Sequence, residues 1–385
     1  MAEPLKNYFG ADVPVRVGES LLAVDRSFDL DAFVSYCLDG FDELELTPRA
    51  RQIANAMAAF LPADRGRALD IVVDSLGAEL ENCDPDDVER VDGDSHNPMA
   101  GFFYMPHGYF IAQHGLEYFA KAMRANYELT KRFTAEFSIR PYLEHHTESA
   151  LEKLTAWATD PNVHIRRLVS EGSRPRLPWA PRLKQFQDDP APVLELLELL
   201  KDDPTEYVRR SVANNLNDIA KDHPAIVVDV AARWWAEGDD RRQRLVRHGL
   251  RTLIKSGDPS ALEVLGFGAS SPASLGTSSI EPDVVRIGEK VTVVAAIENP
   301  SSAVCRALVD LRLNFVKANR TTTPKVFKGA ELEIQPGETA SVRKKISLAQ
   351  HSTRTHYPGT HPVEVLVNGV AIPIGSFELL SADEG

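Results

Sequence analysis

The sequence predicts a mainly α-helical protein, an α-solenoid that is followed by a small all-β domain. Apolar residues recur at helical spacing through the first two thirds of the 385 residues, and a segment near residue 160 returns 43 residues later. Beyond residue 281 apolar and polar residues alternate, which is typical of strands. We therefore expect a helical-repeat domain over residues 1–260, a linker over 261–280 and a β-domain over 281–385.

Composition is that of an ordinary soluble protein, with 43% hydrophobic and 26% charged residues. The chain has no apolar run of the roughly 20 residues that span a bilayer, and its first residues lack the basic and apolar pattern of a signal peptide. Its three cysteines are far apart and form no C-x-x-C pair. We expect a cytoplasmic protein whose cysteines are reduced.

Charge is distributed unevenly along the chain. Residues 1–120 contain 8 Lys or Arg against 22 Asp or Glu, whereas residues 121–255 contain 23 against 20. Because affinity for phosphate depends on local basic residues, the net charge of -13 does not exclude a DNA-binding face in the middle of the chain.

Successive amphipathic patterns predict the helices of the first 140 residues. Thr47 is a suitable N-cap, since its hydroxyl can accept from an exposed backbone N–H, and Pro48 suits the first helical turn. Residues 84–108 are rich in Asp, Pro and Gly and predict a loop, and Pro141 stops the helix that precedes it. The predicted helices are Phe28–Leu38, Thr47–Phe60, Ala63–Leu80, Tyr109–Met123 and Asn126–Arg140.

A repeat then decides the architecture. The sequence DPNVHIRRLVS from Asp160 aligns with DPTEYVRRSVA from Asp203, 43 residues later, and a weaker copy reaches Val246. An Asp-Pro turn that leads into a helix at a period near 40 residues is typical of HEAT-type helical pairs. Such pairs stack side by side, so we expect a concave surface that is open to a ligand.

The region after the repeats changes to strand patterns separated by Gly, Pro and Asn turns. About seven short strands in roughly 100 residues fit an Ig-like sandwich, here without the Cys-Trp-Cys core. The clearest predicted strands are Val284–Ile287, Val291–Ile297, Ala307–Phe315, Ala340–Leu348 and Val363–Val367.

The helix that begins near His164 is apolar on one side and charged on the other. At 100° per residue, Arg167, Glu171 and Arg174 fall within about 60° of one another. An acid thus lies between two bases on a face that we expect to be accessible to solvent. This arrangement suits an anionic ligand that carries a positive centre.

The second repeat presents the same pattern. Arg210, Asn214, Asn217, Asp218 and Lys221 fall on one side of its helix, opposite an apolar side. The 43-residue offset aligns the first three with the charged residues of the first repeat. Two interpretations stay open: a solvated outer face, or a row of polar groups that binds a ligand on the concave surface.

Glu136 and Trp179 have unusual settings. Glu136 lies beside the apolar stripe of its predicted helix, where a carboxylate either pairs with an arginine such as Arg132 or Arg140 or serves as a functional acid. Trp179 follows Pro178 in a basic loop, where the indole either stacks on a sugar or base or fixes the loop.

Motifs for common cofactors are missing from the sequence. It has no P-loop, no G-x-G-x-x-G after a strand and no G-x-S-x-G, and its histidines form no H-E-x-x-H set. We therefore expect neither a cofactor nor a metal.

A resemblance to a known family rests on three segments, FTAEFSIRP over Phe133–Pro141, SEGSRPRLPW over Ser170–Trp179 and SVANNLNDIAKDHP over Ser211–Pro224. Together they resemble the bacterial AlkC-type DNA glycosylases, AlkD-like HEAT-repeat proteins of alkylation repair, over about residues 20–260. Some members carry a C-terminal Ig-like domain that contacts DNA. The resemblance implies excision of 3-methyladenine and 3-methylcytosine from double-stranded DNA, without full flipping of the base into a pocket.

The resemblance also implies roles for individual residues. A cationic base leaves as a neutral molecule, so the main tasks are to stabilise an oxocarbenium-like sugar and to position water. The residues assigned to these tasks are Glu136, Glu171 and Asp218. The residues assigned to DNA binding are Arg167 and Arg174 at phosphates, Trp179 against the lesion nucleotide, and Arg210, Asn214 and Lys221.

The alternative function belongs to a different class. A non-enzymatic HEAT-repeat scaffold binds DNA or an acidic protein partner on its concave face, and its β-domain recruits a partner. Release of bases from methylated DNA distinguishes the two. In either case we expect a monomer.

Overall fold

The computed structural model describes residues 5–85, 100–268, 271–350 and 355–382, and the chain forms two compact units, Met1–His223 and Pro224–Gly385. The division after His223 precedes the predicted domain boundary at residue 260. The reason is that helices of the second unit share an apolar cluster with its strands. This cluster consists of Leu262, Leu265, Phe267 and Leu308, with Trp235 and Ile254 packed against it.

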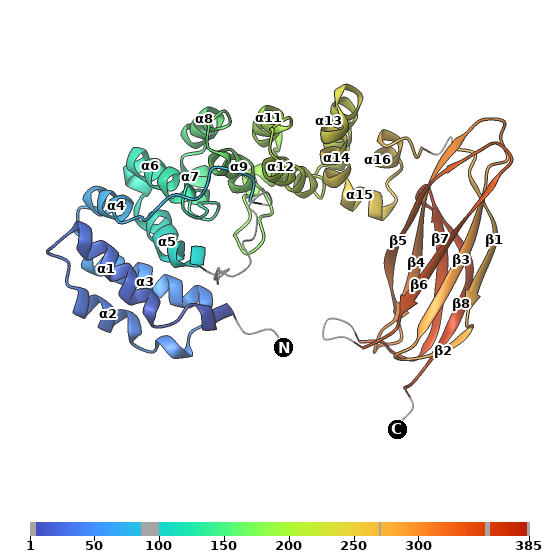
Figure 1. Cartoon of the computed structure of the whole chain (residues 1–385), viewed down its shortest axis with the longest axis horizontal. Coiled ribbons are helices and arrows are strands. Elements are labelled where there is room, and N and C mark those ends of the chain that lie inside the picture. The colour runs from blue at the N-terminus through green and yellow to red at the C-terminus, as the bar shows by residue number, and fades with distance from the viewer. Residues whose placement is uncertain (1–4, 86–99, 269–270, 351–354, 383–385) are drawn as a thin grey trace. The chain divides into compact units, whose positions relative to one another are not determined.

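The first unit is a stack of α-helices (Figure 1). Short 3-10 turns lie at Leu5–Tyr8, Phe41–Glu43, Ala100–Tyr104 and Leu116–Tyr118. The helices are α1 Asp12–Val24, α2 Leu30–Leu38, α3 Leu46–Phe60, α4 Arg65–Asp74, α5 Met105–His114, α6 Phe119–Thr130, α7 Arg140–His145, α8 Thr147–Trp157, α9 Val163–Gly172, α10 Lys184–Asp188, α11 Ala191–Leu200 and α12 Glu206–Ile219.

The helix predicted over Asn126–Arg140 is wrong beyond Thr130. Helix α6 ends at Thr130, a turn segment follows, and α7 begins at Arg140. Pro141 therefore starts a helix rather than stopping one, because its fixed φ suits the first turn and its missing N–H would have no partner there.

Two other predictions are corrected in part. The helix predicted over Tyr109–Met123 is divided between α5 and α6 by a turn after Gly115. The helix predicted over Ala63–Leu80 ends at Asp74. Of the loop predicted over residues 84–108, residues 86–99 lie outside the described residues, and α5 already begins at Met105.

The predicted repeat is confirmed as two helical pairs. Helix α8 packs on α9 and α11 packs on α12, while α9 and α12 lie against each other. Both pairs contain the same aspartate turn, in which the side chain accepts from the backbone N–H two residues later. The distances are 2.8 Å for Asp160 with Asn162 and 2.9 Å for Asp203 with Thr205.

The second unit contains helices and the predicted Ig-like β-domain, which is confirmed. One sheet has the strand order β1-β3-β6 and the other β2-β8-β7-β4-β5, and they enclose a common apolar core. The elements are α13 Pro224–Glu237, α14 Asp240–Gly249, α15 Arg251–Ser256, α16 Pro259–Val264, β1 Ser274–Glu281, β2 Val284–Arg286, β3 Lys290–Glu298, β4 Cys305–Val316, β5 Thr322–Ile334, β6 Thr339–Ser347, β7 Gly359–Val367 and β8 Val370–Leu380.

Strand β1 begins inside the residues 261–280 that were predicted as a linker, and α16 ends inside them. Its sequence SLGTSSIE is poor in large apolar residues, and β1 is an edge strand that pairs only with β3 in its sheet. Such strands give little alternation of apolar residues. Within the described residues, the helices are all too short or too polar to cross a membrane.

Candidate functional site

The polar sides of α9 and α12 meet where the two helices pack. Asn162 caps α9 by accepting from the backbone N–H of His164 at 2.9 Å, which fixes where the helix begins. The predicted apolar sides are buried, and they consist of Ile165, Leu168 and Val169 in α9 and Val208, Val212, Leu216 and Ile219 in α12. The charged residues of the two helices are therefore turned toward each other and toward the segment that contains Glu136.

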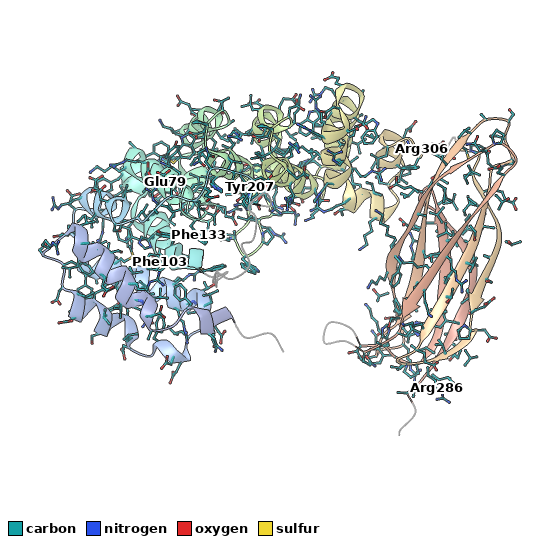
Figure 2. All side chains as sticks on the ribbon, in the orientation of Figure 1. Glu79, Phe103, Phe133, Tyr207, Arg286 and Arg306 are labelled. Atoms are coloured by element: carbon teal, nitrogen blue, oxygen red, sulfur yellow. The ribbon has the colours of Figure 1, made fainter. Side chains whose placement is uncertain are left out.

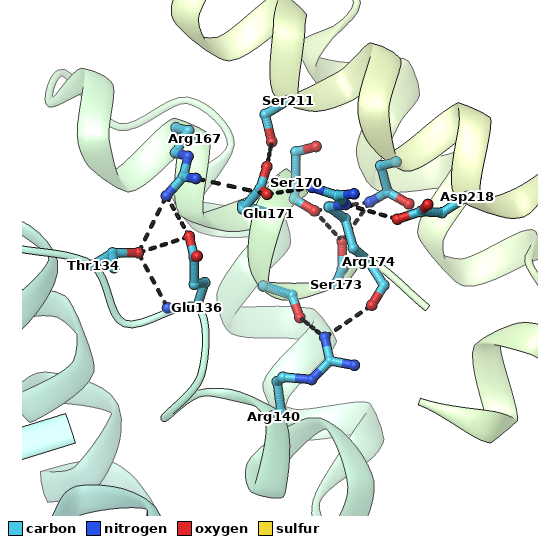
Figure 3. A network of polar contacts seen from close by, with 12 residues as sticks. Thr134, Glu136, Arg140, Arg167, Ser170, Glu171, Ser173, Arg174, Ser211 and Asp218 are labelled. Carbon is cyan, nitrogen blue, oxygen red and sulfur yellow. Dashed lines mark hydrogen bonds and ion pairs between the residues drawn. The ribbon is translucent and has the colours of Figure 1, made fainter. Parts of the chain in front are cut away.

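Acids and bases alternate through this contact (Figure 3). Glu136 Oε2 accepts from Arg167 Nη1 at 2.5 Å, and Arg167 Nη2 lies 3.6 Å from Glu171 Oε1. Arg174 donates from Nη1 to Glu171 Oε1 at 2.5 Å and from Nε to Asp218 Oδ2 at 2.8 Å. We call these five residues the charge network. It brings together the three acids that the resemblance singled out.

The expectation of a solvent-accessible face is wrong for most of the network. Glu171 is 6% exposed, Arg174 7% and Asp218 2%, because α12 covers this side of α9. Ser211 of α12 donates to Glu171 Oε2 at 2.6 Å. Burial acts to raise the pKa of Glu171, but Arg167 and Arg174 outweigh it and hold the pKa below its ordinary value. The carboxylate is therefore ionised at neutral pH.

Glu136 lies in the turn segment after α6 rather than on a helix. Its partner is Arg167 of α9, not Arg132 or Arg140. Arg132 instead binds Glu128, with 2.7 Å between its Nη1 and the carboxylate. Thr134 supports the pair, since its Oγ1 donates to Glu136 Oε2 at 2.9 Å and accepts from Arg167 at 3.2 Å.

The remaining polar residues of the second repeat lie around the network. Lys221 donates to Asp218 Oδ1 at 2.8 Å, and its side chain is 40% exposed. Arg210 and Asn214 are half-buried, and each has an interaction partner within the protein. Asn217 is 3% exposed and also has a partner. Lys221 is thus the member of this set that extends the charge network toward solvent.

Trp179 is 84% exposed and has a φ of 65°, in the left-handed region. The indole does not fix its loop. Arg140 does so instead, donating to the backbone carbonyls of Arg174 at 2.8 Å and Pro181 at 2.6 Å. Burial lowers the pKa of Arg140 to about 10. A large aromatic surface is thereby presented to solvent on a loop that the buried guanidinium holds in place.

Sequence reasoning missed Ser211 and Tyr207. Tyr207 belongs to the first turn of α12 and is labelled in Figure 2. The centroid of its ring lies 5.5 Å from Arg167 Cζ. A signal for Ser211 was present, because the 43-residue offset aligns it with the buried Leu168. A hydroxyl at a position that is apolar in the preceding repeat marks a place where the helix interface contains a polar group. For Tyr207 the offset gives His164, which offers no comparable contrast.

Within the parts of the chain that the structure describes, no group of three or more His, Cys, Asp or Glu side chains is arranged to hold a metal ion.

Comparisons with known proteins cover both parts of the chain. Residues 126–248 match a family model described as DNA alkylation repair enzyme, and these residues include the whole charge network. Residues 274–381 match a model described as the C-terminal Ig-like domain of the uncharacterised protein YhaZ.

Two relatives match over most of their length. The uncharacterized protein YhaZ of Bacillus subtilis (strain 168) is 33% identical over 332 residues, which are 86% of this chain and 87% of that protein. The alkylpurine DNA glycosylase AlkC of Pseudomonas fluorescens, solved bound to DNA containing an abasic site analog, is 32% identical. The match has a TM-score of 0.84 and covers 98% of this chain and 100% of that chain.

Proposed function

Because the chain belongs to the AlkC-type family of DNA-alkylation repair proteins with a C-terminal Ig-like domain, we propose that it is a DNA glycosylase that acts on cationic N3-alkylated bases. Its substrates are then 3-methyladenine and 3-methylcytosine in double-stranded DNA. The observation that carries the proposal is the charge network, which holds Glu136, Glu171 and Asp218 together through two arginines.

The reaction needs what buried carboxylates supply. The bond between C1′ and the base nitrogen breaks with its electron pair going to the base, which leaves neutral. Positive charge then develops on the sugar, and water adds to C1′ and loses a proton. Ionised carboxylates stabilise that positive charge, and they act more strongly in a site of low dielectric than in water.

The exposure of the three acids divides their roles. The Glu136 side chain is 13% exposed, against 8% for Glu171 and 3% for Asp218. We assign Glu136 and Glu171 to the sugar and the attacking water, and Asp218 to a supporting charge. Arg174 is committed to Glu171 and Asp218, so we now assign it to ordering these acids rather than to gripping a phosphate.

The DNA contacts in the proposal come from residues around the network. Trp179 packs against the lesion nucleotide, as its exposure supports, and the base is not fully flipped out of the duplex. Arg167, Arg210, Asn214 and Lys221 contact the DNA backbone, which predicts an affinity that falls as salt concentration rises.

The test is release of bases from a methylated duplex in a single turnover, with the released bases identified by chromatography. Glu171→Gln is expected to slow the release of 3-methyladenine by roughly 100- to 1,000-fold, with little change in affinity for DNA. Asp222→Asn is a matched control, since Asp222 pairs with Arg176 outside the network.

Two results would contradict the proposal. Wild-type protein that binds the duplex and releases no base is a scaffold, which is the alternative function. Unchanged excision by Glu171→Gln removes that carboxylate from the chemistry. Circular dichroism of each variant shows whether a slow variant is folded.

A further inference from the structure

Arg167 lies among three groups that each attract a cation. The Glu136 carboxylate is 2.5 Å from its Nη1, and the Glu171 carboxylate is 3.6 Å from its Nη2 (Figure 3). The Tyr207 ring centroid is 5.5 Å from its Cζ, a distance at which a ring quadrupole attracts a positive charge. Two carboxylates and one aromatic face therefore share a single guanidinium.

These groups come from separate segments of the chain. Glu136 belongs to the turn segment after α6, Glu171 to α9 and Tyr207 to the first turn of α12. Asp84 accepts from the backbone N–H of Tyr207 at 2.9 Å and so helps to hold that turn in place. The arrangement is thus built by the tertiary fold.

Arg167 is the more accessible partner in these contacts. Its side chain is 20% exposed, whereas those of Glu136 and Glu171 are 13% and 8% exposed. A long side chain with an exposed portion can swing outward, but the two acids are held by Thr134, Ser211 and Arg174.

We propose that Glu136, Glu171 and Tyr207 form a cation seat, which Arg167 occupies in the DNA-free protein and which a cationic alkylated nucleotide takes over when it binds. This inference rests on the proposed function. Binding is then an exchange of one cation for another, and the displaced guanidinium of Arg167 pairs with a backbone phosphate of the DNA.

The exchange gives a physical basis for selectivity. A positively charged nucleotide replaces Arg167 without changing the net charge of the seat. A neutral nucleotide would leave Glu136 without its counter-ion and Glu171 with Arg174 alone, an arginine that it shares with Asp218, which is costly in a partly buried site. Arg167 therefore excludes undamaged bases by remaining in place.

The first experiment tests the seat without DNA. In Arg167→Ala, methylguanidinium at millimolar concentration is expected to raise the melting temperature more than NaCl of equal ionic strength. Arg176→Ala is the matched control, because Arg176 is 22% exposed and pairs with one carboxylate, Asp222. A response no larger than that to NaCl, or an equal response in Arg176→Ala, would overturn the seat.

The second experiment measures the preference for a cation on DNA. It compares affinities for duplexes that contain a cationic pyrrolidine abasic analogue or a neutral tetrahydrofuran one. Tyr207→Leu is expected to lower the ratio of these affinities by roughly fivefold, and Tyr207→Phe to retain it. A general loss of phosphate contacts lowers both affinities by the same factor, so it does not change their ratio.

The two experiments separate failure of the seat from failure of the proposed function. An unchanged ratio in Tyr207→Leu, in a protein that still releases methylated bases, removes Tyr207 from the seat and leaves the glycosylase activity standing. A methylguanidinium response in a protein that releases no base supports the seat and contradicts the proposed function.

Discussion

Arg174→Met removes the guanidinium that neutralises two buried carboxylates. Glu171 and Asp218 are 6% and 2% exposed, and Arg174 donates to both at 2.5 and 2.8 Å. Breaking a buried ion pair in this way destabilises a protein by about 3–5 kcal/mol, because buried charge is left with fewer partners. The partners that remain are Arg167 and Ser211 for Glu171, and Lys221 for Asp218. In a unit the size of Met1–His223, each kcal/mol lowers Tm by about 2–4 °C. The expected fall in Tm is therefore roughly 6–20 °C.

The effect should depend on pH in a defined direction. The pKa of Glu171 is held down in the folded protein by its arginines, so its stabilising effect is present above the ordinary glutamate pKa and is lost as pH falls. Loss of Arg174 raises the folded-state pKa, so the stability gap between wild type and Arg174→Met is widest at neutral pH and narrows in acid. The double variant Arg174→Met/Glu171→Gln should recover part of the loss.

Thermal denaturation measures the fall in Tm, and urea denaturation at pH 7.5 and pH 5 measures how the free energy of unfolding depends on pH, both followed by circular dichroism. Arg176→Met provides the control, since Arg176 and Asp222 form a more exposed pair and such pairs contribute about 0–1 kcal/mol. If Arg174→Met is no less stable than Arg176→Met, or if its deficit grows as pH falls, the assignment of Arg174 as the residue that holds the buried acids is refuted.

Three further predictions concern other parts of the chain. Trp179→Ala should change stability by less than about 0.5 kcal/mol, because the side chain is 84% exposed. In fluorescence anisotropy it should weaken binding to abasic-site duplex by roughly 5- to 150-fold. Burial lowers the pKa of His107 to about 4. As pH falls from 6.5 to 4, His107 therefore binds a proton in the unfolded protein but not in the folded one, and the free energy of unfolding decreases. The free energy of unfolding of the wild type should fall by roughly 3 kcal/mol more over this range than that of His107→Phe. Urea titrations at each pH measure the difference. Gly369→Ala should destabilise the second unit by about 1–3 kcal/mol in calorimetry, because φ is +80° and the added Cβ would lie 2.7 Å from Gly257 O and Leu262 Cδ1.

Periodicity predicted the helices well where local signals and tertiary packing agree. The helix predicted over Thr47–Phe60 is found at Leu46–Phe60, although Glu45 occupies the N-cap position that was predicted for Thr47. The failure at Thr130 has a tertiary cause, because Ser138 donates to Asn126 Oδ1 at 2.6 Å and folds the following segment back onto α6. Apolar residues at helical spacing continue through this segment, so the pattern contains no sign of a contact between two polar side chains.

The candidate site was predictable in residue type and chain position, but not in burial. Helical angles predict that Arg167, Glu171 and Arg174 lie on one side, and their side chains do come together, although α9 itself ends at Gly172. The angles do not reveal that α12 covers this side, which is why an expected surface became a buried network. Whether the charged side of α9 is buried depends on the residues of α12 that face it. The sequence signal for a polar contact there is Ser211, which the 43-residue offset aligns with Leu168.

Joining two helices through the charge network requires charged groups to be removed from water, which costs free energy. Well-packed apolar residues at a buried ion pair often give equal or greater stability, so stability alone does not explain why Glu171, Arg174 and Asp218 are present. Their geometry does, because Ser211 of α12 holds Glu171, Arg174 holds Asp218 from the other helical pair, and Glu171 is ionised before any ligand arrives. A site that must stabilise positive charge gains from carboxylates that are already oriented, since no reorganisation is then required during the reaction. In the exchange proposed above, Arg167 also keeps Glu136 and Glu171 from meeting a neutral base. Stability and selectivity therefore depend on the same contacts, and a variant that relaxes one should relax the other.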